Sequence, residues 1–360
     1  MTRPSLLRRL AAGTLLLFLS QPLGAQQSPD WLSKMSIHGY LNQAYAISDG
    51  HPIFGIPTEG TTDYRDVAVQ FRLDQDRKHA FVLQLRQERL GESPRAGGDV
   101  GLDWAFFQRN VSDRFSFKVG RIPLPLGIFN EAGGAAATSP FFRPPNEFYE
   151  RQYTSKTLDG ALATVSFGKT GGWNFDVDGY FGQWALDQWA SGESADARNA
   201  WGAQLWANAP WTGVRFGGGA YRCTVEPAYA DAVDYLMLHG SIEADFDRVL
   251  LATEYLTGNL DQYGRYRAWY AQIGYQFTRQ LSVHARGAVA RIHVPVNGHT
   301  VDASLSDDLG LAVNYAFTPA LLLKVEGHTN EGLLRDDLPR NLYASPTETR
   351  YFIASVVATF

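Results

Sequence analysis

Apolar and polar residues alternate along this chain in segments of about ten residues, and the alternation is clearest in the last segment. One of its faces carries Phe360, Ala358, Val356, Ala354 and Phe352, and the other carries Tyr351, Ile353, Ser355, Val357 and Thr359. A period of two residues is the signature of a β-strand whose two faces meet different surroundings. The same period recurs over residues 66–73, 235–246 and 308–317, so the sequence predicts an all-β protein.

Turn-forming segments separate these strands, and they fall into two length classes. Seven short turns are expected at residues 74–78, 111–114, 169–172, 209–213, 247–248, 278–280 and 318–320. Eight longer connections are expected near residues 48–63, 91–101, 122–156, 183–198, 224–233, 258–265, 294–306 and 332–348. Short turns on one side and long loops on the other are typical of membrane barrels, whose strands need about 9–11 residues to cross the bilayer.

Fifteen connections join sixteen strands. The fold class predicted is therefore a transmembrane antiparallel up-and-down β-barrel of about sixteen strands that occupies residues 35–360 as one domain. We expect it to close where the strand at residues 37–47 pairs with the strand at residues 350–360.

The period of two alone does not separate a membrane barrel from a soluble sandwich, but the placement of aromatic residues does. Aromatic residues on the apolar face lie next to the short turns or at the chain end: Phe115, Phe167, Trp173, Phe246, Phe277, Phe317 and Phe360. Aromatic side chains gather at the membrane–water interface as a girdle. A sandwich has no reason to place them at one end of every hairpin, so the pattern favours the membrane barrel.

The first 25 residues have the features of an export signal. Arg3, Arg8 and Arg9 precede a short apolar stretch, Leu10 to Leu19, and Leu23-Gly24-Ala25 is a suitable cleavage site. The apolar stretch is too short for a membrane-spanning helix, which needs about 20 residues. We therefore expect a cleaved signal peptide at residues 1–25, a short periplasmic tail at residues 26–34, and an outer-membrane location.

Composition excludes several other classes. The single cysteine, Cys223, cannot form an internal disulfide. Loss of the three signal arginines changes the net charge from −5 to −8, which argues against a nucleic-acid partner. The sequence contains no P-loop and no H-E-x-x-H, C-x-x-C or G-x-S-x-G motif, so we expect no enzymatic activity, no cofactor and no metal.

The terminal strand resembles the segment that the barrel-assembly machinery reads in bacterial outer-membrane barrels. That resemblance implies the assembly machinery as a partner, with outer-membrane lipid and lipopolysaccharide around the barrel. The third connection, residues 122–156, is the longest. In sixteen-stranded porins the third external loop folds into the lumen and narrows it, and we expect the same here. The alternative is a surface flap that packs on itself.

Residues 118–131 read K-V-G-R-I-P-L-P-L-G-I-F-N-E. This is similar to the K-x-G-R-x-K-x-P-L-G-x-Y-N-E stretch of a family of proteobacterial outer-membrane porins related to the phosphate-selective type. Residues 102–105 and 37–40 also resemble that family, and the match covers residues 36–156. Pro123 stands where the family has its second basic residue, and Ala132-Gly133 replaces an arginine-aspartate pair. The resemblance implies the barrel and a pore role. It is compatible with a homotrimer, and it does not identify the solute.

Charged residues on the polar faces of the strands are the candidate pore lining. Arg72, Arg86, Arg109 and Lys118 lie on four consecutive strands and would form a basic strip, with Asp176, Asp178, Glu243, Asp245 and Glu254 further round the wall. The candidate pore-lining and constriction residues are Arg72, Arg86, Arg109, Lys118, Arg121, Glu131, Arg143, Glu147, Glu150 and Arg151. The alternative is that these charges pair within the wall, for example Arg86 with Glu88. The acidic pair Asp307-Asp308 is expected in an external loop.

These features predict a porin for the passive diffusion of small hydrophilic solutes or ions. A substrate-specific channel and, less in keeping with the pattern, a barrel enzyme of the phospholipase kind remain alternatives. Such an enzyme needs a serine and a histidine within hydrogen-bond reach on the lipid-facing side. The inward phase of Ser241, His239 and His284 argues against it. The sign of ion selectivity stays open.

Overall fold

The computed structural model describes residues 31–93, 96–132, 139–149, 156–187, 194–211, 213–226, 231–261, 264–296, 298–336 and 344–360. The expected signal peptide, Glu150 and Arg151 lie outside these ranges. The chain divides into two units, residues 1–35 and 36–360. In the first unit the described part is a short 3-10 helix, η1 (Leu32–Lys34), and the first residue of strand β1.

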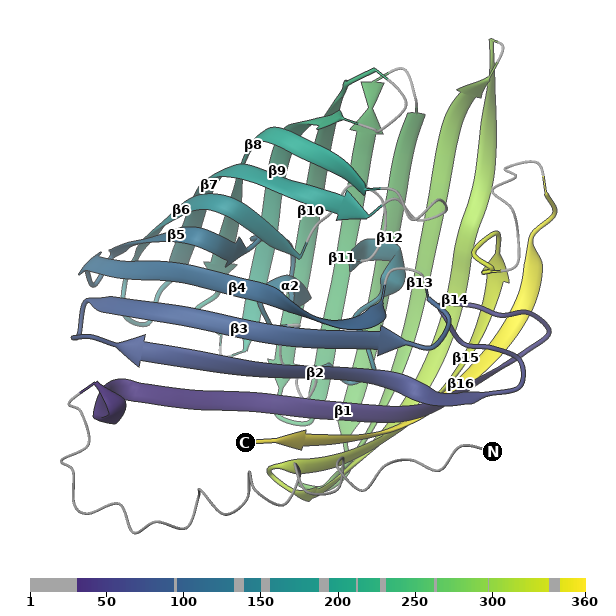
Figure 1. The fold of residues 1–360 in the computed structure, drawn as a ribbon, viewed down its shortest axis with the longest axis horizontal. Coiled ribbons are helices and arrows are strands. Elements are labelled where there is room, and N and C mark those ends of the chain that lie inside the picture. The colour runs from purple at the N-terminus through teal and green to yellow at the C-terminus, as the bar shows by residue number, and fades with distance from the viewer. Residues whose placement is uncertain are drawn as a thin grey trace, which may run out of the picture. The chain divides into compact units, whose positions relative to one another are not determined.

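The second unit is a closed antiparallel barrel in which each described strand pairs with its neighbours in sequence (Figure 1). The sixteen strands within the described residues confirm the predicted number. Their bounds are β1 (Met35–Asp49), β2 (Thr61–Asp74), β3 (His79–Leu90), β4 (Gly97–Ser112), β5 (Phe115–Pro123), β6 (Thr157–Gly168), β7 (Asn174–Asp187), β8 (Ser194–Asn208), β9 (Val214–Glu226), β10 (Val233–Phe246), β11 (Val249–Leu260), β12 (Gly264–Gln276), β13 (Leu281–Val296), β14 (His299–Thr318), β15 (Leu321–Gly332) and β16 (Thr347–Thr359).

The barrel closes between β1 and β16, as predicted. The register runs from Tyr40 opposite Thr359 to Asp49 opposite Arg350. At the end of the seam, Gly39 and Phe360 exchange two backbone hydrogen bonds of 3.0 and 3.1 Å. A Cβ atom on Gly39 would overlap the Phe360 ring, so the glycine leaves the space that the terminal ring occupies.

The outer face of the barrel is apolar, and the predicted girdle aromatics lie on it. All seven are exposed, from 37% for Phe115 to 67% for Phe360. Between them and the upper ends of the strands lie exposed Leu, Ile and Val residues such as Leu238, Ile273 and Leu311. An apolar outer band flanked by aromatics is what a bilayer requires of a barrel. Among the described residues, no helix has the length and apolar character needed to cross a membrane.

Several of the expected loops are shorter than predicted, because strands extend into them. Residues 290–296 pair with residues 299–306 in a ladder in which Val296 lies opposite His299, with one register shift beside Ala290. Residues 258–260 likewise pair with residues 264–266. Asp307 and Asp308 belong to β14 and not to a loop. These errors have one cause: above the bilayer neither face of a strand must be apolar, so a polar strand extension looks like a loop in the sequence.

The interior of the barrel is filled by side chains and by the third connection. Its helices are α2 (Phe129–Ala132) and α3 (Asn146–Tyr149). Apolar residues of this connection, Leu124, Leu126, Phe142 and Phe148 among them, are buried together with inward-facing tyrosines of β9, β10 and β12. The core of this protein therefore lies inside the ring of strands and positions the candidate site.

Candidate functional site

Two groups of inward-facing residues hold the third connection against one side of the lumen. The first centres on Glu254 of β11, which is 2% exposed. Its carboxylate accepts the Ile128 N–H at 2.9 Å and the hydroxyls of Ser241 and Tyr270 at 2.5 and 2.6 Å, and also the Tyr149 hydroxyl. The connection turns here at Gly127, whose φ of +61° and contact with Glu254 exclude a side chain. We call this group the Glu254 anchor.

The second group lies on β13 to β15 and holds residues 139–143. Lys324 donates to the carbonyls of Ser139 and Phe141, and Glu326 accepts the Phe142 N–H at 2.8 Å. Nearby, the Asn314 amide donates to the Pro140 carbonyl at 2.9 Å, and Arg286 donates to the Arg143 carbonyl at 3.1 Å. Lys324 is 1% exposed. These bonds satisfy backbone groups that have no secondary structure of their own. We call this group the Lys324 anchor.

Glu147 of α3 reaches the same wall between the two anchors. Its carboxylate accepts the Ser306 hydroxyl at 2.6 Å, and its backbone carbonyl accepts the Tyr266 hydroxyl. Burial raises the pKa of the Glu147 carboxyl above its usual value, and the nearby charge of Asp308 raises it further. Asp308 itself accepts from His328 at 2.8 Å and from Tyr351 at 3.0 Å.

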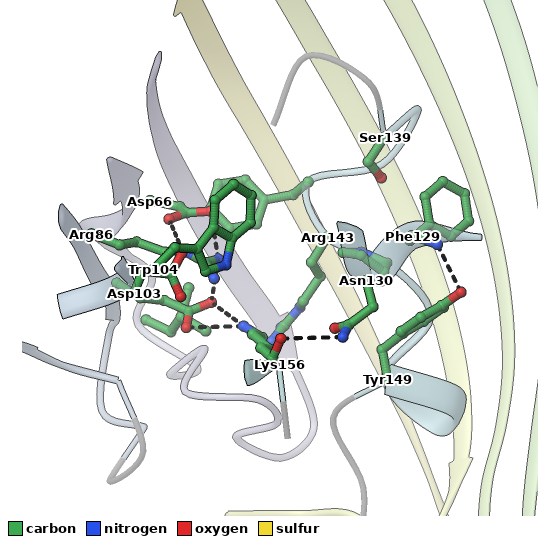
Figure 2. Close-up of a pocket in the computed structure, with 14 residues that line it drawn as sticks. Asp66, Arg86, Asp103, Trp104, Phe129, Asn130, Ser139, Arg143, Tyr149 and Lys156 are labelled. Atoms are coloured by element: carbon green, nitrogen blue, oxygen red, sulfur yellow. Dashed lines mark hydrogen bonds and ion pairs between the residues drawn. The ribbon is translucent and has the colours of Figure 1, made fainter. Parts of the chain in front are cut away.

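On the opposite side, a cavity of about 40 Å³ separates the third connection from β2 to β4. Figure 2 shows Arg86 and Asp66 on one side of it and Phe129 and Tyr149 on the other, with Lys156 between them. Arg86 bonds both oxygens of Asp66 at 2.7 and 2.8 Å and reaches Glu88 at 3.3 Å. Lys156 also reaches Glu88, at 3.2 Å. Four of the charged residues that line this cavity, Asp66, Arg86, Glu88 and Lys156, are thus joined by ion pairs.

Of the candidate pore residues, three basic ones face inward. Arg72 pairs with Asp74 at 2.8 Å, Arg86 pairs as described above, and the Lys118 ammonium lies 5.6 Å from the centre of the Phe106 ring. The alternative reading, in which wall charges pair within the wall, therefore describes Arg72 and Arg86.

The loop candidates are only partly described. Arg143 and Glu147 are buried in the third connection. The guanidinium of Arg143 lies 4.9 Å from the centre of the Phe54 ring and bonds the Tyr64 hydroxyl. The Glu131 side chain, Glu150 and Arg151 lie outside the described part of the chain.

Two expectations are wrong, because Arg109 of the expected basic strip and Arg121 of the candidate pore lining both face outward. In the register, Arg109 lies two residues from Phe107, the cross-strand partner of the exposed Phe81. Arg121 pairs with Asp159 on the outer face at 3.5 Å. The alternation could not give the phase of β4, because aromatic residues occupy both of its faces around Phe107. Arg121 lies two residues after the outward-facing Val119 in β5, and therefore on the same face.

Sequence reasoning found Glu254 as an inward acid but missed its partners and the whole Lys324 anchor. One signal was present: Lys324 and Glu326 lie two residues apart on the same face of a strand whose other face is apolar. Such a pair of inward charges indicates a partner inside the barrel, but it does not identify the partner.

No protein family matches the sequence of this chain, and no curated protein does either. Solved structures do match its fold. The outer-membrane channel DcaP of Acinetobacter baumannii is 10% identical with a TM-score of 0.61, over 91% of this chain and 97% of that one. An anion-selective porin from Comamonas acidovorans is 11% identical with a TM-score of 0.59, over 91% and 99%.

OmpT, an outer-membrane protein of Vibrio cholerae solved in a trimer form, is 12% identical with a TM-score of 0.58, over 91% of this chain and 99% of that one. At these identities the likeness concerns the fold. The phosphate-selective subtype suggested by residues 118–131 finds no support in a family match. The shared closed barrel, together with the apolar outer band, points to the cell outer membrane.

Proposed function

We propose that this chain is an outer-membrane porin, a passive and non-enzymatic channel for small hydrophilic solutes or ions that assembles as a homotrimer. The observation that carries the proposal is the unequal exposure of the two inner walls. Inward residues of β10 to β16, including Glu254, Arg286, Lys324 and His328, are buried under the third connection. On β2 to β7 the inward polar residues Asp66 and Gln84 are buried, but most others stay partly exposed: Gln70, Arg72, Gln108, Lys118, Thr164, Ser166, Asp176 and Asp178.

A polar, partly exposed wall inside an apolar barrel supports a water-filled route along β2 to β7. The third connection would set its narrowest point, with Arg86 and Lys156 at the edge. The cavity there, of about 40 Å³, has room for only a few water molecules, since one water needs about 10–15 Å³ on the same measure. We therefore expect a low single-channel conductance and slow passage of sugars.

The enzyme alternative requires a serine and a histidine within hydrogen-bond reach, and one such pair is present. The His284 ring nitrogen Nε2 is 2.9 Å from the Ser282 hydroxyl. Both residues are buried and face the lumen, and in the described residues the Nδ1 of His284 has no hydrogen-bond partner that could orient the ring. A lipid in the bilayer has no access to this pair, which supports a non-enzymatic barrel. Purified protein should release no fatty acid from phospholipid vesicles.

The decisive experiment is single-channel recording of the purified, folded protein in a planar bilayer. The proposal expects discrete conductance steps that increase linearly with salt concentration and disappear after heat unfolding. A folded, heat-modifiable barrel that inserts but conducts nothing would overturn it. Chemical cross-linking of the protein in detergent tests the homotrimer separately.

A further inference from the structure

Strand β4 contains a β-bulge that places two consecutive side chains inside the barrel. Gln84 of β3 lies opposite Trp104, and the next pair in the register is Leu85 with Leu102, so Asp103 is the extra residue between them. In regular alternation Asp103 would face away from Trp104, toward the lipid. Instead, both residues line the cavity between β2 to β4 and the third connection (Figure 2). Bulges redirect side chains in this way beside functional sites.

The carboxylate of Asp103 differs from the other charged groups of the cavity lining. It accepts a hydrogen bond from the Gln84 amide at 2.7 Å, and within the described residues it has no ion pair. The other two carboxylates of the lining are joined to basic side chains, as described above. The third basic residue of the lining, Arg143, bonds the Tyr64 hydroxyl and lies against the Phe54 ring. The carboxylate that the cavity leaves for a solute is therefore that of Asp103.

Two more oxygen atoms and one aromatic ring of the lining lack partners within the described part of the chain. Ser139 is 4% exposed, and its hydroxyl has no hydrogen-bond partner there. The Asn130 amide donates to the carbonyls of Leu124 and Lys156 at 2.6 and 3.2 Å, which leaves its side-chain oxygen available. The Trp104 ring is partly exposed. Because a buried polar group without a hydrogen bond is costly, this arrangement favours a ligand that donates the missing bonds.

We propose that this cavity binds the ammonium group of a small organic amine that passes through the channel, an inference that rests on the porin function proposed above. An ammonium group has three N–H donors and no acceptor, which matches a carboxylate, an amide oxygen and a hydroxyl. The face of the Trp104 indole attracts a cation. An anion, in contrast, would find Arg86 and Lys156 already paired.

The size of the cavity supports the same class of ligand. Its volume of about 40 Å³ equals the space of about three water molecules on the same measure. An ammonium group with its first carbon atoms fits this space, whereas a sugar ring is too large for it. The cavity would therefore bind the charged end of an amine and leave the rest of the molecule in the lumen.

The test uses the purified, folded protein and three probes of similar size: n-butylammonium, n-butanol and butyrate. In single-channel recording, butylammonium should interrupt the potassium chloride current in a concentration-dependent manner, whereas butanol and butyrate should not. Asp103→Asn should raise the half-blocking concentration about tenfold, because a neutral acceptor replaces a charged one. Trp104→Leu should raise it about fivefold, because the cation–π contact is lost.

The matched controls change the same types of side chain inside the lumen but outside the cavity lining. Asp176→Asn removes an inward carboxylate that accepts from Ser166 on β6. Phe106→Leu removes an inward ring that packs against the core, two residues from Trp104. Both controls should retain the wild-type half-blocking concentration. Equal effects of Asp176→Asn and Asp103→Asn would overturn the proposal, because the wall charge would then act at long range without a site.

Saturation-transfer NMR of butylammonium with the detergent-solubilised protein measures the same binding without a current. A wild-type protein that conducts but binds butylammonium no better than butanol would overturn the ammonium site and leave the porin function standing. A protein that binds butylammonium through Asp103 but conducts nothing would support the site and overturn the porin function. Heat-modifiable mobility establishes that each variant is folded. If Asp103→Asn fails to fold, the order of the three probes on the wild type still decides.

Discussion

The two inner walls of this barrel use charged residues in opposite ways. On β10 to β16, Glu254 and Lys324 are almost fully buried, and each bonds the backbone of the third connection. On β2 to β7, Arg72 and Asp74 pair with each other and stay accessible, with side-chain exposures of 36% and 49%. A buried charge that loses its partner is costly, whereas a solvated pair contributes little to stability. The first wall should therefore determine the geometry of the lumen, and the second its electrostatics.

The largest expected effect comes from removing the Glu254 anchor. Glu254→Ala leaves the Ile128 N–H and the hydroxyls of Ser241, Tyr149 and Tyr270 without their acceptor. Since each unsatisfied buried donor costs about 1–3 kcal/mol, the loss in free energy of unfolding should be about 3 kcal/mol or more. The single-channel conductance should rise, because residues 127–128 are released from the wall. Denaturant unfolding and bilayer recording measure the two effects.

Glu254→Gln is the matched control for that change. It keeps one oxygen that can accept the Ile128 N–H, so it should recover most of the wild-type conductance. Arg72→Gln, on the other wall, should cost less than about 1 kcal/mol. If Glu254→Ala lowered stability but left conductance unchanged, Glu254 would be a structural residue with no part in setting the width of the lumen.

A smaller loss is expected at the Lys324 anchor. Lys324→Met keeps the length of the side chain and removes the ammonium, so the carbonyls of Ser139 and Phe141 lose a buried donor. We expect a loss of about 2 kcal/mol in the free energy of unfolding. Lys118→Met makes the same substitution on the accessible wall and should cost less than about 1 kcal/mol, the value of an exposed cation–π contact. Equal losses in the free energy of unfolding for Lys324→Met and Lys118→Met would contradict the claim that only one wall holds the third connection.

The barrel itself could be predicted because several of its strands show local alternation and because short turns alternate with long loops along the chain. The pairing of β1 with β16 followed from the count of seven short turns and eight long loops, and the girdle aromatics from their position beside short turns. The anchors could not be predicted in this way. Glu254 and Ile128 are 126 residues apart, and Glu326 and Phe142 are 184 apart. No periodicity relates a strand to the loop that folds against it. The face on which Arg109 lies could not be predicted either, because aromatic residues occupy both faces of β4.

Charge changes on the accessible wall should alter selectivity and leave geometry intact. Replacing Arg72 and Lys118 together by glutamine should shift the reversal potential in a salt gradient toward cations, because wall charges set the local concentration of permeant ions. The shift should shrink as the screening length falls from about 10 Å at 0.1 M to about 3 Å at 1 M salt. Arg109→Gln with Arg121→Gln is the matched pair on the outer face, and it should leave the reversal potential unchanged. A reversal-potential shift of the same size in both double variants would mean that charges inside the lumen have no greater effect on selectivity than charges on the outer face.

The smallest expected effect concerns pH and tests the buried wall once more. The pKa of Glu147 is raised in the folded protein, first by burial and then by Asp308, so the folded state binds its proton more tightly than the unfolded state. Its contribution to stability is therefore greatest below the usual carboxyl value of 4.5 and declines as the pH rises through the folded pKa. Glu147→Gln, which resembles the protonated form and can still accept the Ser306 hydroxyl, should remove this decline. The measurement is the free energy of unfolding at pH 4 and at pH 7 for both proteins. A Glu147→Gln variant that kept the wild-type slope would show that another buried group is responsible.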